Sequence, residues 1–117
     1  MQKAKQLKNG LRYHLIPFDG TQAVTVLVLT NVGSRYETDK VWGGSHFIEH
    51  MMFKGTKKRP TTLDISKELD RYGAQFNAYT GKDLTGYYVK IASDKTEVAI
   101  DLLHDMLFNS KFDQKEL

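Results

Sequence analysis

The chain has 117 residues, 40% hydrophobic and 26% charged, which is the composition of one globular domain with a modest core. Because it contains no cysteine, it can have no disulfide framework, no thiolate metal ligand and no cysteine nucleophile. Its formal net charge is only +3, and no apolar run approaches the ~20 residues of a membrane span, so we expect neither a nucleic-acid partner nor a membrane segment.

The first third of the chain predicts a hairpin followed by a strand. Asn9-Gly10 is a favoured two-residue turn, and the residues after it alternate between apolar and polar, as in a half-buried strand. Residues 23–30 are β-branched and almost wholly apolar, which favours a central strand covered on at least one face. We interpret Arg35 and Glu37, two positions apart, as an ordinary surface pair. Trp42 is expected to pack where the next helix begins.

Segment 43–53, G-G-S-H-F-I-E-H-M-M-F, carries three side chains suited to metal chemistry. In a helix, His46 and His50 lie one turn apart on one face, with their Cβ atoms about 5–6 Å apart. Two imidazoles at that spacing can bind one zinc ion. Glu49 lies on the same side of the helix, where it can reach a metal-bound water without being a ligand. This H-x-x-E-H order is the inverse of H-E-x-x-H, and both serve zinc peptidases.

The residues between these three are apolar, so we expect the helix to be buried on most of its circumference and to stop before Gly55. Two imidazoles and a carboxylate in such surroundings would be costly to desolvate without a metal or mutual pairing. The pattern therefore favours a metal site. The alternative is a buried His–Glu–His cluster that binds no metal.

The middle of the chain predicts a loop, a helix and two strands. Four basic residues between positions 54 and 59 indicate a solvated loop, since no aromatic platform or nucleic-acid motif accompanies them. Thr61 and Asp64 supply the N-cap and the acidic first turn of an imperfect amphipathic helix that Gly73 closes. Residues 74–80 and 85–92 are rich in strand formers.

The end of the chain predicts a helix from Asp94, with Glu97 placed for a capping interaction. Residues 112–117 have the pattern of the opening of another helix. The order of elements indicates an α+β domain, an antiparallel or mixed sheet with helices packed on one face in two layers. The apolar stripe of the helix from Asp94 consists of Val98, Ala99, Leu102, Leu103, Met106 and Leu107.

Four segments resemble, in the same order, the pitrilysin, insulinase and mitochondrial processing peptidase family of zinc metallopeptidases. The resemblance implies that His46 and His50 are ligands of Zn2+ and that Glu49 is the general base of a zinc-dependent endopeptidase. The family's third ligand, a glutamate, is expected beyond Leu117. Residues 1–117 would then be a single partial domain, the first part of the catalytic domain, and inactive alone. The segments are V-G-S-R-Y-E at 32–37, G-G-S-H-F-I-E-H-M-M-F-K-G-T at 43–56, G-A-Q-F-N-A-Y-T at 73–80 and T-G-Y-Y at 85–88.

The resemblance also implies partners. A peptide or protein substrate would add as a strand to a sheet edge, where Asn77 and Ala78 match positions that border the substrate backbone. The same open edge leads us to expect self-association of residues 1–117. Alternatives are a non-catalytic peptide-binding or scaffold subunit of a processing-peptidase-like complex, and a zinc-dependent regulator without hydrolysis. The compartment is unknown; without a signal-peptide core, a cytoplasmic location is expected.

Overall fold

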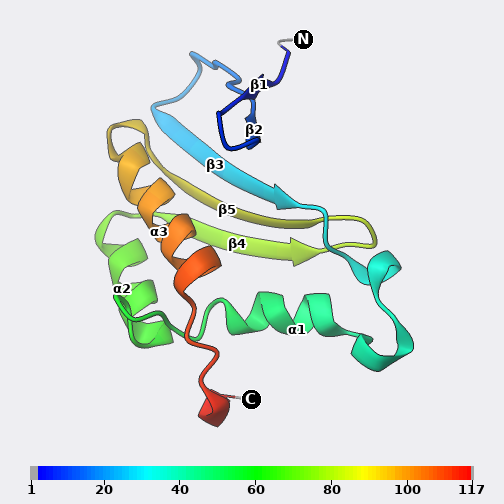
Figure 1. The fold of residues 1–117 in the computed structure, drawn as a ribbon. Coiled ribbons are helices and arrows are strands. Elements are labelled where there is room, and N and C mark those ends of the chain that lie inside the picture. The colour runs from blue at the N-terminus through cyan, green and yellow to red at the C-terminus, as the bar shows by residue number, and fades with distance from the viewer. Residues whose placement is uncertain (1–2, 117) are drawn as a thin grey trace.

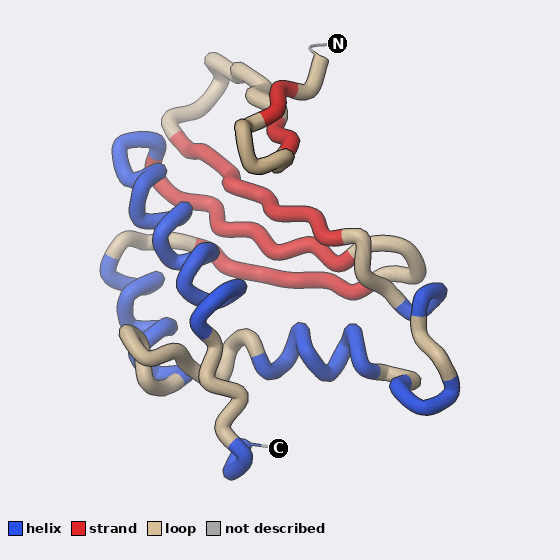
Figure 2. Tube along the Cα trace, viewed as in Figure 1, coloured by secondary structure: helices blue, strands red, loops and turns tan. Residues whose placement is uncertain are grey.

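The computed structural model describes residues 3–116 and has two layers, a sheet with helices on one face (Figures 1 and 2). This confirms the predicted α+β architecture, and the sheets are antiparallel. In the segment 112–117, where the opening of a helix is predicted, Gln114–Glu116 form a 3-10 turn, and Leu117 lies outside the described residues. The strands are β1 (Lys5–Gln6), β2 (Arg12–Tyr13), β3 (Ala23–Thr30), β4 (Gln75–Thr80) and β5 (Thr85–Ala92), and the α-helices are α1 (Gly44–Met51), α2 (Thr62–Arg71) and α3 (Thr96–Asn109).

The larger sheet has the order β3-β5-β4. The central position predicted for residues 23–30 is therefore wrong: β5 is central and β3 lies at an edge. The side chains on β5 that face the helices are almost fully buried, with Val89 0% exposed, because both neighbours and the helices cover them. On β3 only one face is covered, and Leu27 and Leu29 on the other face are 48% and 51% exposed.

The core lies between this sheet and helices α2 and α3. The apolar stripe predicted for α3 is confirmed, because Ala99, Leu102, Leu103 and Met106 are all buried there. The predicted cap of α2 is also confirmed, as Thr61 and Asp64 form a reciprocal capping box. The capping role predicted for Glu97 is wrong, because α3 begins at Thr96, after a 3-10 turn at Ser93–Lys95.

The N-terminal hairpin forms a separate two-stranded sheet (Figure 1). Its turn is at Asn9-Gly10 as predicted, with Gly10 at φ +91° and the Leu11 N–H donating to the Asn9 Oδ1 at 3.0 Å. The strands are only two residues long, and Leu11 and Leu15 are 57% and 60% exposed. The half-buried strand predicted after the turn is therefore wrong.

The basic segment between α1 and α2 contains a buried arginine. Arg59 is 4% exposed and donates to Glu68 on α2 and to Asp101 and Asp105 on α3. The solvated loop predicted here is thus wrong for Arg59, because three carboxylates replace its hydration. The network fixes the segment that follows α1 against both other helices.

Helix α1 lies at the β4 edge of the sheet rather than within the core (Figure 1). Ser45 and Met51 are buried, but Phe47 and Ile48 are 48% and 41% exposed. The expectation of a helix buried on most of its circumference is therefore wrong for this chain. No helix among residues 3–116 is long and apolar enough to cross a bilayer.

Candidate active site

The start of α1 is held by a carboxylate from outside the helix. Gly43 has φ +81° and carries no side chain that could cap, so the first N–H groups need an external acceptor. Glu37 supplies it: its Oε1 accepts from the Ser45 N–H at 2.8 Å and its Oε2 from the Gly43 N–H at 2.7 Å. These backbone hydrogen bonds lower the pKa of Glu37, that from Ser45 most.

The interpretation of Arg35 and Glu37 as a surface pair is therefore wrong. Arg35 pairs instead with Asp83 at 3.0 Å, at the tip of the β4–β5 hairpin. The missed signal for Glu37 was an acidic residue shortly before a helix that begins with glycines. Such a helix has a positive end without its own cap.

The two histidines meet on the exposed side of α1. Their Nε2 atoms lie 2.9 Å apart and their ring centroids 4.5 Å apart, which confirms the predicted one-turn spacing. Bonds of ~2.0–2.1 Å to one zinc ion in tetrahedral geometry would place these nitrogens about 3.3 Å apart. A shift of a few tenths of an ångström would thus admit the metal, so His46 and His50 fit the zinc that the sequence implies.

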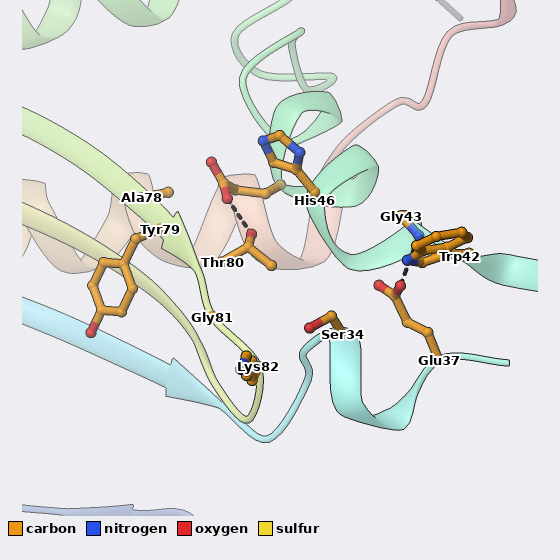
Figure 3. Close-up of a pocket in the computed structure, with 11 residues that line it drawn as sticks. Ser34, Glu37, Trp42, Gly43, His46, Ala78, Tyr79, Thr80, Gly81 and Lys82 are labelled. Atoms are coloured by element: carbon orange, nitrogen blue, oxygen red, sulfur yellow. Dashed lines mark hydrogen bonds between the residues drawn. The ribbon is translucent and has the colours of Figure 1, made fainter.

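Glu49 lies in the same helix turn and is fixed from the sheet. Its Oε2 accepts a hydrogen bond from the Thr80 hydroxyl, at the end of β4 (Figure 3). Tyr87 on β5 is buried, and both this burial and the Glu49 carboxylate raise the pKa of its phenol. The phenol therefore stays neutral beside the carboxylate.

A cleft of about 490 Å³ opens beside His46 and Glu49 (Figure 3). Trp42 stands at its rim and is 86% exposed, so the packing role predicted for this residue is wrong. The cleft runs between the start of α1, the segment around Ser34 and the end of the β4–β5 hairpin. Its lining consists of Ser34, Glu37, Trp42, Gly43, His46, Glu49 and residues 78–82.

Strand β4 is the sheet edge that borders this cleft. At the hairpin end the Gly81 N–H donates to the Leu84 carbonyl at 2.8 Å. Since backbone bonding alternates along an antiparallel pair, the odd-numbered residues of β4 bond to β5, and residues 76, 78 and 80 direct their N–H and C=O groups to the open edge. Accordingly the Ala78 N–H donates to the side-chain Oδ1 of Asn77 at 2.8 Å.

The chain brings two imidazoles together in this arrangement. Within residues 3–116, no cluster of three or more His, Cys, Asp or Glu side chains has the geometry of a metal site. A structural or catalytic zinc needs at least three protein ligands. A further donor would therefore have to come from outside the described residues.

Known proteins resemble this chain over most of its length. A family model described as Insulinase (Peptidase family M16) matches residues 15–117. The mitochondrial-processing peptidase subunit beta of Dictyostelium discoideum is 43% identical over 111 residues, 95% of this chain and 24% of that protein. The uncharacterised zinc protease YmxG of Bacillus subtilis is 41% identical over 117 residues, 100% of this chain and 28% of that protein.

The fold has a solved counterpart as well. A crystal structure of a protease from Helicobacter pylori matches with a TM-score of 0.89 and 30% identity, over 97% of this chain and 27% of that one. The chain thus spans about a quarter of the length of the proteins it matches.

Proposed function

The chain belongs to the insulinase family of peptidases, family M16, and on this premise we propose that it forms the first part of the catalytic domain of a zinc-dependent endopeptidase. His46 and His50 would hold the metal through Nε2, and Glu49 would act as general base. The observation that carries the proposal is the 2.9 Å approach of the two Nε2 atoms on the helix that also presents Glu49 to the cleft.

In this proposal the zinc, Glu49 and Glu37 have different roles. A bound zinc would lower the pKa of a water and polarise the scissile carbonyl. Glu49 would take up the proton of that water and return it to the leaving amine, while the Thr80 hydroxyl holds its Oε2. Glu37 holds the N-terminal end of α1, the helix that carries both imidazoles.

The substrate class follows from the open edge of β4. An extended peptide can add to the even-numbered residues of this strand, because their backbone donors and acceptors face the edge beside α1. Ala78 would then bond to the peptide backbone, and the Asn77 side chain, which now occupies the Ala78 N–H, would turn to bind the peptide. We therefore propose peptides and unfolded protein segments as substrates, and residues 1–117 alone as inactive.

A single assay tests this function. The full-length protein should cleave an unstructured, internally quenched peptide, lose the activity on treatment with a chelator and regain it with added zinc. Binding of the peptide without cleavage, in protein loaded with zinc, would favour the non-catalytic peptide-binding or scaffold subunit. The presence of both histidines and Glu49 in one helix turn weighs against that alternative.

A further inference from the structure

A row of three threonines crosses the larger sheet near its end, at Thr30, Thr85 and Thr80. The first two hydroxyls donate to backbone carbonyls: Thr30 to that of Thr85 at 3.2 Å, and Thr85 to that of Val32 at 2.7 Å. The Thr80 hydroxyl instead leaves the sheet and donates to the Glu49 carboxylate on α1. Three chemically identical side chains in equivalent positions thus have different partners.

We infer that Thr80 is a positioning residue, which fixes the carboxylate of Glu49 for proton transfer and links it to the peptide-binding edge. The inference rests on the proposed function, in which Glu49 is the general base.

The side chain of Thr80 is suited to hold a carboxylate in one orientation. A glutamate has three side-chain torsions, whereas threonine is β-branched and restricted at χ1. Thr80 is only partly exposed, and its strand pairs with β5, where the residue opposite Thr80 is the buried Thr85. A hydrogen bond from this rigid donor to Oε2 therefore restricts the rotation of the Glu49 carboxylate.

The backbone of the same residue faces the open edge of β4. Thr80 is one of the even-numbered residues whose N–H and C=O groups point away from β5, and it lines the cleft together with Ala78. A peptide that adds to this edge would bond next to, or at, the residue that holds the base. Thr80 thus fixes the distance between the peptide backbone and the carboxylate that acts on it.

Three variants of the full-length protein test the inference. Thr80→Val removes the hydroxyl and keeps the β-branched shape, Thr80→Ser restores a hydroxyl, and Thr30→Val removes the equivalent hydroxyl at the far end of the row. We measure kcat and KM on the quenched peptide, zinc content by mass spectrometry, and the Glu49 conformation in a crystal structure of each zinc-free variant.

Thr80→Val should lower kcat about 10- to 100-fold, since misplacement of a catalytic group by about 1 Å can cost that much. Its KM and zinc content should stay within twofold of the wild type, and the Glu49 side chain should leave its wild-type position. Thr80→Ser should recover most of kcat, and Thr30→Val should leave kcat unchanged. A wild-type kcat in Thr80→Val, or an unmoved Glu49, would overturn the inference, as would loss of zinc that accounts for the lost activity.

The crystallographic measurement separates this inference from the proposed function. If the wild-type protein shows no chelator-sensitive cleavage, the proposed function fails. An unmoved Glu49 in zinc-free Thr80→Val would instead contradict the positioning role, whether or not the wild type is active.

Discussion

The guanidinium Nη1 of Arg59 lies 2.8 Å from the Oδ2 of Asp105, which is 46 residues later in the chain. Both side chains are buried, at 4% exposure each. The contact joins the segment after α1 to the last helix of the core. The neighbouring Thr56 also donates to Asp105, at 2.6 Å, so this segment is tied to α3 by two buried side chains.

Asp105→Asn should therefore destabilise the protein by about 1.5–3 kcal/mol, the usual contribution of a hydrogen bond to a charged group, because it removes the buried counter-charge while Glu68 and Asp101 still pair with Arg59. Burial alone would raise the pKa of Asp105, but hydrogen bonds from Thr56, Arg59 and Asn109 outweigh it and lower the pKa overall. Urea unfolding at pH 7 measures the difference. The matched control is Asp101→Asn, whose exposed carboxylate also contacts Arg59 and should cost less than about 1 kcal/mol. Equal losses in the two variants would contradict this account.

The cap of α1 predicts an acid-dependent loss of stability. In the folded state the pKa of Glu37 lies below its ordinary value of 4.5, so its hydrogen bonds stabilise the fold fully above pH 4.5. This contribution is lost as the pH falls through the lower, folded-state pKa. Thermal unfolding should thus show Glu37→Gln less stable than the wild type at neutral pH, with the gap closing as the pH falls below 4.5. A gap that does not change with pH would show that the charge of Glu37 contributes nothing.

The sequence predicted the features that depend on short-range periodicity. His46 and His50 meet because four residues complete about one helical turn, and Thr61 caps α2 because Asp64 is three residues away. The two strands of the β4–β5 hairpin follow from their strand-forming residues, and their bounds agree with the prediction within one residue.

The features that it did not predict depend on contacts between distant segments. Thr80 reaches Glu49 across 31 positions and Arg59 reaches Asp105 across 46, and neither pair has a signal at a helical or strand period. The exposure of Phe47 has a different cause. Apolar residues indicate a helix face that prefers burial, but they do not indicate which segment packs against that face. The position of β3 at an edge also depends on which strands pair with it. A run of apolar residues can form either an edge strand or a central strand, so the sequence pattern does not distinguish the two.

Residues 1–117 alone should bind zinc weakly. Two imidazoles are fewer than the three protein ligands that a zinc site needs. Imidazoles that lack hydrogen-bond partners for their other ring nitrogen are also less well oriented for binding. Isothermal titration of the isolated chain with zinc, compared with the full-length protein, measures this. Tight stoichiometric binding by the monomeric chain would contradict the two-ligand arrangement.

Residues 1–117 should also self-associate through β4, because the open edge presents backbone donors and acceptors next to exposed apolar side chains. Ala78→Pro removes an N–H that faces this edge and leaves the bonds to β5 intact, so it should weaken the association. Ala78→Val, which keeps the N–H, is the control. Multi-angle light scattering across a micromolar concentration series measures the mass. A monomer at every concentration would contradict the prediction.

The central claim is that Glu49 acts on water at a metal that His46 and His50 hold, without being a ligand itself. The most direct measurement is the zinc content and peptide cleavage of full-length Glu49→Gln and His50→Ala, purified side by side. Glu49→Gln should retain zinc at the wild-type level and lose cleavage by at least ~10²–10⁴-fold, the usual contribution of a positioned general base. His50→Ala should lose both zinc and cleavage. A Glu49→Gln variant that lost zinc as fully as His50→Ala, or one that cleaved the peptide at the wild-type rate, would contradict the account.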